Sequence, residues 1–440
     1  MKLAVVVQRY GADINGGAEL HARYIAERLA RHANVEVVTT CARDYVSWRN
    51  ELPPGVEQVN GVPVRRFRVR RERDPNVFGR RSQHVFDRNH SIADELIWLD
   101  SEGPASDDLV DYVSSAPFDY VLLFSYRYYH SWHIARRIPQ RTVLVPTAER
   151  DPAITLGIFG PVFRGVRAVM YNSHEERAMI HAAAGNQRIP GVVVGVGSEV
   201  PSKTDAPGFR HRFHINRRFA IYIGRIDENK GCGELFHYFQ RYAATFPRGL
   251  DLVLVGSAVM PVPVHPRIHH LGFLSDQDKF DALAASDLLI MPSYFESLSM
   301  VALEAWALGR PVLANGRCDV LKGQCLRSNA GLFYESYEEF AETLYALESN
   351  GPLHARLGLN GRNYFVTHYA WPVIVRKYLD MFERLSASRE ELPAMEPLPH
   401  WWARRRANRP PAARLLKEIP TGPAAMTGES SPIVDRRRPA

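Results

Sequence analysis

The sequence predicts an α/β protein with two domains, each built on a mostly parallel, doubly wound sheet. Short apolar runs that fit buried strands alternate with helical patterns along most of the chain. That order is typical of parallel sheets with helices on both faces. The chain has 440 residues, which is long enough for two domains that each bury a core of their own.

Strands are predicted at residues 2–7, 35–40, 120–125, 141–146, 168–172 and 192–196 in the first half, and at 219–223, 252–256 and 288–290 in the second. Helices are predicted at residues 18–31, 279–285, 301–308, 337–349, 352–367 and from about 371 to 385.

Composition limits the classes of function. The chain is 45% hydrophobic and 23% charged, with a formal net charge of +7 carried mostly by arginine. This balance favours anionic partners such as nucleotide diphosphates, acidic lipids or nucleic acid. Nucleic acid is the weakest of these, because no helix-turn-helix, RNP or zinc-finger pattern is present. The four cysteines lack metal-binding spacing and no apolar run approaches the ~20 residues of a membrane span, so we expect a cytoplasmic protein with reduced thiols.

The most informative stretch is residues 291–311. The strand at 288–290 delivers the chain to a turn, Ser297 or Ser299 is placed to cap a helix, and Gly309 with Pro311 ends it. In an open α/β sheet, ligands bind at this carboxyl edge. The amides of Ser297, Leu298 and Ser299 therefore suit a phosphate group.

Two carboxylates, Glu296 and Glu304, are eight residues apart in this stretch. On a helix that spacing turns about 80°, so the two share roughly one face. A ligand with a diphosphate at the helix tip would meet one carboxylate near each end. The structural alternative is a first-turn acid favoured by the helix dipole and a solvated Glu304.

Two further stretches pair strand ends with groups that suit a phosphate. Gly16 and Gly17 lie between the first strand and the first helix, where glycine lets a ligand approach the backbone. Arg225 follows the strand at 219–223, and Lys230 lies five residues on, so together they predict a diphosphate clamp.

Residues 291–312 resemble the E-x7-E motif of retaining glycosyltransferases of the large family-4 (group 1) type, which have the GT-B fold. The match includes Pro292-Ser293, Phe295, the Ser-Leu-Ser run, Glu304-Ala305 and Gly309-Arg-Pro-Val312. The resemblance implies two Rossmann-like domains facing a cleft. It also implies that Glu296 contacts the donor sugar and that Glu304 holds the nucleotide ribose.

The resemblance extends to the other stretches. Gly16-Gly17-Ala-Glu and the G-R-x-x-x-x-K-G context of Arg225 and Lys230 are similar to the family's pattern, which implies that the two cations face the donor phosphates. By the same resemblance, Gly272 and Phe273 line the nucleobase pocket.

The resemblance also sets the expected organisation. Residues 1–200 would form the acceptor-side domain and residues 201–367 the donor-binding domain. A helix at 368–385 would cross back to the first domain. Residues 386–440 read as a Pro- and Arg-rich tail, partly disordered, in which Trp401-Trp402 and Arg404-Arg-Arg406 could touch a membrane interface.

One strand-end loop departs from the family pattern. Many relatives place a histidine that supports the transferring sugar after the strand at 141–146, where this chain has Glu149, Arg150 and Asp151. We expect Glu149 and Arg150 to contact the sugar or the acceptor. A turn at Asp151-Pro152 with an Arg150–Glu149 pair is the structural alternative.

Residues 65–81 hold eight arginines with two interleaved phenylalanines: Arg65, Arg66, Arg68, Arg70, Arg71, Arg73, Arg80 and Arg81. We expect a surface that faces an acceptor or an anionic membrane, which would make the protein peripheral on the inner face of the membrane. A solvated charged edge is the alternative.

Together these observations predict a retaining, metal-independent hexosyltransferase that uses no cofactor. It would move a sugar from a nucleotide sugar to a hydroxyl of a glycan, lipid-linked or small-molecule acceptor, in polysaccharide or glycoconjugate biosynthesis. Arg225, Lys230 and Glu296 would carry catalysis, and Asp276-Gln-Asp278 would cap a helix rather than bind metal. The alternatives are a GT-B nucleotide-sugar epimerase and a non-catalytic nucleotide-sugar or glycan-binding protein.

Overall fold

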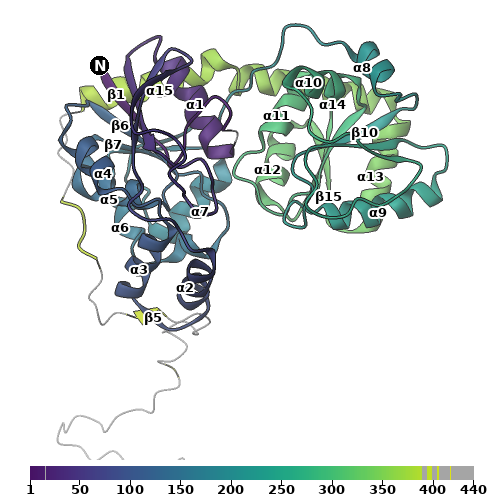
Figure 1. The fold of residues 1–440 in the computed structure, drawn as a ribbon. Coiled ribbons are helices and arrows are strands. Elements are labelled where there is room, and N and C mark those ends of the chain that lie inside the picture. Colours follow the sequence, from purple (N-terminus) through teal and green to yellow (C-terminus); the bar gives the residue numbers. More distant parts are fainter. Residues whose placement is uncertain (15, 389–393, 399–403, 406–416, 418–440) are drawn as a thin grey trace, which may run out of the picture.

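The computed structural model describes residues 1–14, 16–388, 394–398, 404–405 and 417. Two α/β domains lie side by side, each with a sheet between helices (Figure 1). The predicted fold class is confirmed.

Within the described residues, the first domain has an eight-stranded sheet of order β3-β4-β2-β1-β6-β7-β8-β9. All neighbours pair in parallel except the antiparallel β3–β4 hairpin. The strands are β1 (Lys2–Val6), β2 (Asn34–Thr40), β3 (Gly55–Val59), β4 (Val62–Phe67), β6 (Tyr120–Phe124), β7 (Thr142–Val145), β8 (Ala168–Tyr171) and β9 (Gly191–Val193).

The second domain has a six-stranded sheet in the described part of the chain, with every pair parallel and the order β12-β11-β10-β13-β14-β15. Its strands are β10 (Phe219–Ile223), β11 (Asp251–Val255), β12 (Ile268–His270), β13 (Leu288–Met291), β14 (Val312–Asn315) and β15 (Gly331–Tyr334).

Helices cover both sheets. Those of the first domain are α1 (Gly17–Leu29), α2 (Pro75–Asp87), α3 (Ile92–Glu102), α4 (Asp107–Ser115), α5 (Tyr129–Arg137), α6 (Gly160–Gly165) and α7 (His174–Ala184), with short 3-10 turns η1 (Pro139–Arg141) and η2 (Pro152–Thr155). Those that follow are α8 (Ala206–Arg212), α9 (Cys232–Thr245), α10 (Asp276–Ala285), α11 (Met300–Ala307), α12 (Asp319–Ser328), α13 (Tyr337–Ser349), α14 (Gly351–His368) and α15 (Trp371–Ala387).

Successive side chains on a strand point to opposite faces of the sheet, so each strand contributes to two apolar clusters. On β1, Leu3 and Val5 pack into one apolar cluster, and Ala4 and Val6 into the cluster on the opposite face. The first of these clusters continues into the second domain. α15 returns to the first domain, where Phe382 stacks on Tyr120 with ring centroids 5.3 Å apart.

The arginine-rich run spans the strand β4, a loop and the first half of α2. Five of its arginines pair with acids of the same domain: Arg65 with Glu36, Arg66 with Glu57, Arg70 with Asp100 and Asp107, Arg71 with Asp100, and Arg73 with Glu102. The run is therefore not one continuous cationic surface, because the fold brings in acids from outside it.

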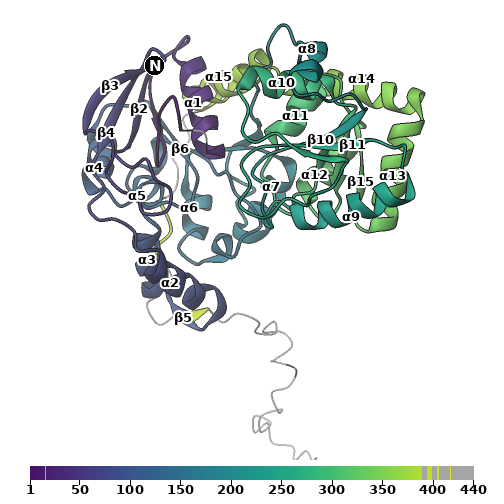
Figure 2. The ribbon, with the colours of Figure 1, turned by 45° about the vertical axis from the view of Figure 1, so that its right-hand side comes forward.

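The sequence did not predict the helical hairpin α2–β5–α3, in which β5 (His90–Ser91) separates the two helices. The hairpin lies at the lower end of the first domain in both ribbon views (Figures 1 and 2). A late segment, β16 (Arg404–Arg405), pairs antiparallel with β5. Trp401, Trp402 and most of the tail lie outside the described residues.

No helix among the described residues combines the length and the apolar character that crossing a membrane requires.

Candidate active site

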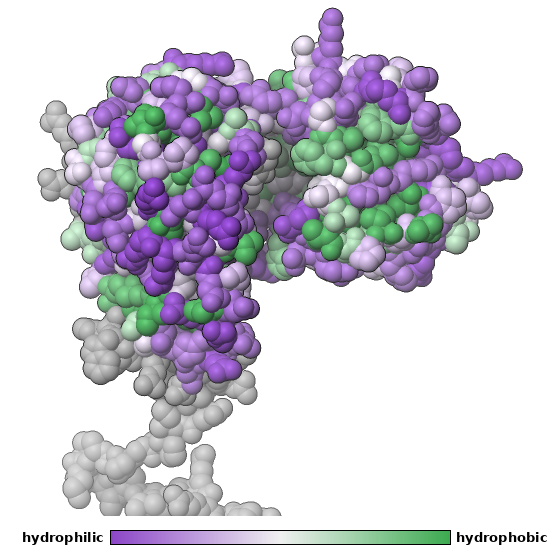
Figure 3. Space-filling model, in the orientation of Figure 1, coloured by the Kyte–Doolittle hydropathy of each residue, from purple (hydrophilic) through white to green (hydrophobic). Residues whose placement is uncertain are grey.

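The candidate site lies at the carboxyl edge of the second sheet. The loops that follow β10 and β13 meet there, and each carries residues that the sequence had singled out. Figure 3 shows the surface hollowed between the two domains.

The loop after β13 is firmly held. The Pro292 carbonyl accepts a hydrogen bond from Asn315 Nδ2 at 3.0 Å, and the Leu298 carbonyl accepts one from Gln324 Nε2. Ser299 has a left-handed backbone with φ 68°, and its side chain caps α11 by accepting from the Ala302 amide. Ser299, and not Ser297, is the cap. A strained non-glycine residue at a sheet edge is typical of functional loops.

The amides that precede α11 are placed for an anion. Those of Ser297, Leu298 and Ser299 donate no hydrogen bond within the described part of the chain. They stand at the positive end of the helix dipole, where phosphates bind.

Lys230 and Glu296 form the centre of the site. Lys230 Nζ lies 2.7 Å from Glu296 Oε1; the Glu296 side chain is largely buried and the Lys230 side chain is 34% exposed. Burial acts to lower the pKa of Lys230, but the Glu296 carboxylate together with Glu149 and Asp227 outweighs it, and the pKa is raised. Lys230 is therefore held as a cation opposite the loop that ends at Ser299.

Arg225 stands at the same edge with its side chain 59% exposed, paired with Asp227. Asp227 also accepts the Lys230 amide at 2.8 Å, so one buried carboxylate orders the whole loop. The guanidinium of Arg225 faces solvent and keeps donors free for a ligand.

Gly231 fixes the distance between the two loops. Its φ is 73°, and a Cβ at this position would lie 2.2 Å from the Pro292 carbonyl oxygen. Only glycine fits such a position, because a side chain would be both strained and in collision with backbone. Gly231 thus keeps Lys230 close to Glu296.

Glu304 is buried at the junction of the domains, with its side chain 4% exposed. Its Oε1 accepts from Ser198 Oγ at 2.8 Å and from Lys279 Nζ at 3.1 Å. Its Oε2 has no partner among the described residues. A buried carboxylate oxygen without a donor is costly, and it is what a ribose hydroxyl would satisfy.

The structure brings Glu149 to this site from the first domain. Burial raises its pKa, and the Glu296 charge adds to the rise while Lys230 opposes it. The Ala148 amide donates to Glu176 Oε1 at 2.6 Å, which anchors the loop next to Glu149. Arg150 reaches the second domain instead, with Nη2 3.2 Å from Asp319 Oδ2, so the alternative pairing of Arg150 with Glu149 is not observed.

Gly16 and Gly17 begin α1 at the carboxyl edge of the first sheet. A Cβ on Gly16 would lie 2.2 Å from Glu19 Oε2, whereas nothing lies within 4 Å of one on Gly17. Arg9 Nε donates to Glu19 Oε1 at 2.8 Å just beneath them. Gly17 therefore leaves open space in front of a buried ion pair.

Gly272 and Phe273 follow β12 at the same edge as the clamp. Gly272 has φ 69° with nothing within 4 Å of a Cβ, and Phe273 is 81% exposed. An exposed aromatic ring on this edge is a surface on which a base can stack.

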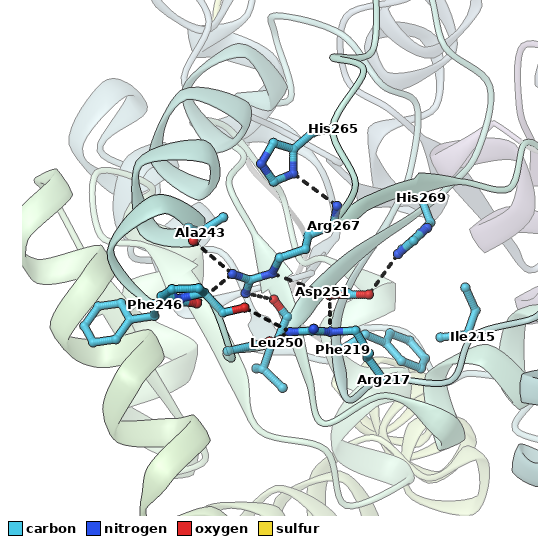
Figure 4. A network of polar contacts seen from close by, with 12 residues as sticks. Ile215, Arg217, Phe219, Ala243, Phe246, Leu250, Asp251, His265, Arg267 and His269 are labelled. Carbon is cyan, nitrogen blue, oxygen red and sulfur yellow. Dashed lines mark hydrogen bonds and ion pairs between the residues drawn. The ribbon is translucent and has the colours of Figure 1, made fainter.

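The neighbouring histidines have structural partners. His269 Nε2 lies 2.9 Å from Asp251 Oδ2, in the network around Asp251 and Arg267 drawn in Figure 4. His270 Nε2 lies 2.8 Å from the Gly256 carbonyl. Across the described ranges, no group of three or more His, Cys, Asp or Glu side chains is arranged to hold a metal ion. Asp276 and Asp278 lie in the first turn of α10, which Ser275 caps.

Sequence reasoning missed the residues that position the site: Asp227, Ser198 and Lys279. Asp227 stands inside the motif that contains Arg225 and Lys230, so its place between two cations was an available signal. Ser198 and Lys279 reach Glu304 from 106 and 25 residues away, and no local pattern marks them.

Comparison with known proteins finds a family match on the second domain. Residues 217–350 match the family model described as Glycosyl transferases group 1. The chain is 28% identical over 204 residues to the MMP alpha-(1->4)-mannosyltransferase of Mycolicibacterium hassiacum, covering 43% of this chain and 48% of that protein. It is 23% identical over 422 residues to the D-inositol 3-phosphate glycosyltransferase of Corynebacterium urealyticum, covering 88% and 95%. A match to the alpha-maltose-1-phosphate synthase of Mycobacterium tuberculosis, 24% identical, covers 39% of this chain and 49% of that protein. Two of these three matches thus span about half the length of the curated relative.

Solved structures share the fold. Sucrose-phosphate synthase from Thermosynechococcus elongatus superposes with a TM-score of 0.63 at 14% identity, covering 88% of this chain and 99% of that one. The Anabaena protein HepE, solved in complex with UDP, gives a TM-score of 0.64 at 16% identity, covering 87% and 100%. The family match thus lies on the domain that holds the clamp, and over both domains the chain has the GT-B fold.

Proposed function

We propose that the protein transfers a sugar from a nucleotide-diphosphate sugar to an acceptor hydroxyl, with retention of anomeric configuration and without a metal ion. The observation that carries the proposal is the Lys230–Glu296 pair at 2.7 Å, directly before the open amides that precede α11. A sugar diphosphate bound here would contact Lys230, Glu296 and the N-terminus of α11.

The cations and amides would act on the leaving group. As the glycosidic bond breaks, negative charge grows on the diphosphate and the sugar becomes oxocarbenium-like. Arg225, Lys230 and the amides at 297–299 would stabilise that charge, and each preorganised donor of this kind is worth about 3 kcal/mol. They would supply the positive charge that some phosphate-transfer sites obtain from metal ions.

Glu296 and Glu304 would hold the two ends of the donor. Arrival of the diphosphate gives Lys230 a second anion to contact, which would free Glu296 to accept hydroxyls of the sugar. The unpartnered Oε2 of Glu304 would accept a ribose hydroxyl, and Phe273 would contact the base.

Retention would follow if the acceptor attacks from the face on which the diphosphate leaves. A new bond forms between the acceptor oxygen and the anomeric carbon while the bond to the phosphate oxygen breaks. The acceptor proton then passes to that phosphate oxygen. The acceptor would be a hydroxyl of a glycan, a lipid-linked sugar or a small molecule.

Release of nucleotide from a panel of nucleotide sugars tests the proposal, starting with uridine donors because HepE was solved with UDP and UDP-glucose. We expect slow release of the diphosphate without an acceptor, faster release with one, and a first-formed sugar of unchanged anomeric configuration by NMR. EDTA should leave the rate unchanged. Conversion of the donor to an epimer would instead indicate an epimerase. Binding without turnover of any donor, with or without acceptors, would indicate a binding protein and overturn the proposal.

A further inference from the structure

The helical hairpin α2–β5–α3 carries an amphipathic groove that the donor site does not use. Its apolar lining is Val77, Val85 and Ile97, and its polar rim is Arg80, Arg81, His84 and Asp94, around a volume of about 300 Å³. Ile97 is 50% exposed. Figure 3 shows apolar side chains among the polar ones at this end of the first domain.

The positive charge of the two arginines on the groove is not neutralised by acids of the described residues. Arg80 is exposed and has no ion-pair or hydrogen-bond partner among the described residues. Arg81 bonds only the neutral Ser101 hydroxyl within those residues. Asp94 is the single acid on the rim, and it also caps α3 through Ser91. Two guanidiniums beside an open apolar floor suit an anionic, partly apolar surface.

The hairpin is attached beside the cleft. Arg73, just before α2, and Arg127, after β6, both contact Glu102 at the end of α3, with closest distances of 3.1 Å and 2.7 Å. Arg127 also lies 2.8 Å from Asp151, two residues beyond Glu149. This ionic chain, buried at Arg73 and Glu102, joins the root of the hairpin to the first-domain wall of the active site. Whatever the hairpin docks on is thereby held near the acceptor side.

We propose that the α2–β5–α3 hairpin docks the protein on an anionic membrane surface, with Arg80 and Arg81 on lipid phosphates and Ile97 at the acyl boundary. Cationic side chains near an anionic leaflet gain attraction, and adjacent apolar side chains add insertion. Resting on the proposed transfer reaction, this geometry favours a lipid-linked acceptor, because the ionic chain links the hairpin to the loop that carries Glu149. A cationic groove for an acidic protein is the competing account.

Vesicle co-sedimentation of the full chain tests the docking without needing a substrate. Vesicles of phosphatidylcholine with phosphatidylglycerol should bind the wild type at low salt, and pure phosphatidylcholine should not. Binding should weaken as salt rises, because charges are screened over about 10 Å at 0.1 M and about 3 Å at 1 M.

Arg80→Glu/Arg81→Glu should lower the vesicle affinity at least about 30-fold, since each arginine near an anionic surface contributes a factor of about five. Ile97→Ser should weaken binding at every salt concentration, which a purely electrostatic patch would not show. Arg80→Glu alone guards against misfolding, because Arg80 is exposed and has no ion-pair or hydrogen-bond partner among the described residues. The matched control is Arg356→Glu/Arg362→Glu, the same change of charge at two exposed positions of α14 in the second domain.

Absence of wild-type binding at low salt would overturn the proposal, as would equal losses in the hairpin and α14 variants. Binding of a soluble polyanionic protein but not of vesicles would favour the competing account. Donor hydrolysis in vesicle-free buffer should be unchanged in all these variants. A protein that binds vesicles but hydrolyses no donor would leave the docking intact and refute only the proposed reaction.

Discussion

At the scale of single residues, the site depends on where charge is buried. Lys230 and Glu296 neutralise one another, while Glu149 faces them from the other domain and Glu304 keeps one oxygen without a partner. Each of these carboxylates is expected to act differently, because each has different neighbours.

Glu149 should make turnover depend on pH. Burial, then Glu296 and Asp151, raise its pKa above the ordinary value of 4.5, while Lys230 and Arg127 oppose the rise. A neutral carboxyl can donate to the sugar and does not repel the diphosphate, so kcat/KM should fall as pH rises through the raised pKa. Glu149→Gln should keep the low-pH rate and lose that fall. If Glu149→Gln is inactive at every pH, the carboxylate itself is required and this interpretation is wrong.

Glu304→Gln should raise the KM for the donor about tenfold or more with little change in kcat. A hydrogen bond to ribose is made equally in the ground and transition states, so its loss removes uniform binding. Asp281→Asn is the matched control: it is also a buried carboxylate, on α10, but both of its oxygens are hydrogen-bonded within the domain. Steady-state kinetics decide the matter, and a large loss of kcat at unchanged KM would place Glu304 at the reacting sugar.

At the scale of elements, two loops at the edge of one sheet make the donor site, and a glycine sets their spacing. Gly231 lies against the Pro292 carbonyl, so the loop after β10 packs directly on the loop after β13. The position of the Lys230 side chain therefore depends on the backbone conformation of Gly231 as well as on the pairing of Lys230 with Glu296.

Gly231→Ala should lower both stability and turnover. The left-handed backbone costs an alanine about 1 kcal/mol, and the collision with the Pro292 carbonyl adds to this and displaces Lys230. Gly185→Ala is the control, because Gly185 has a similar φ of 67° but nothing within 4 Å of a Cβ. Thermal unfolding and donor turnover should both fall further in Gly231→Ala. Equal losses in the two variants would mean that the close approach has no role.

Local patterns predicted the central strands of both sheets and several of the helices. The alternation of apolar runs located strands such as β6 and β10, and helix α13 lies at the predicted residues 337–349. The hairpin α2–β5–α3 was missed because an arginine-rich stretch gave no clear period, although Asp74 caps α2 and Ser91 caps α3.

The residues of the candidate site that lie within short sequence motifs could be predicted from the sequence. Arg225, Lys230, Glu296 and Glu304 stand in two short stretches, and the fold brings those stretches together. The partners that set their charge come from remote elements, as Ser198 and Lys279 do for Glu304. The same reason explains the arginine run, whose acids Glu36 and Glu102 lie outside it.

At the scale of the whole molecule, the domains are tied together by apolar packing and by an ion pair. An apolar cluster continues from the first domain to the second, and α15 returns to pack beside Tyr120. Closer to the cleft, Arg327 Nη2 donates to Glu175 Oε2 at 2.9 Å between α12 and α7. The donor edge therefore faces a defined wall that carries Glu149.

The central claim is that the second-domain edge holds a nucleotide by its diphosphate. Calorimetry should compare the diphosphate and the monophosphate of uridine, adenosine and guanosine for one protein preparation. For the nucleoside that fits, we expect the diphosphate to bind about 10- to 100-fold more tightly, the range of charge-assisted hydrogen bonds to phosphate. That ratio should fall towards one in Arg225→Ala/Lys230→Ala. It should persist in Lys322→Ala, which removes an exposed lysine that also lies 2.7 Å from a glutamate. A ratio near one in the wild type, or an unchanged ratio in Arg225→Ala/Lys230→Ala, would contradict the account.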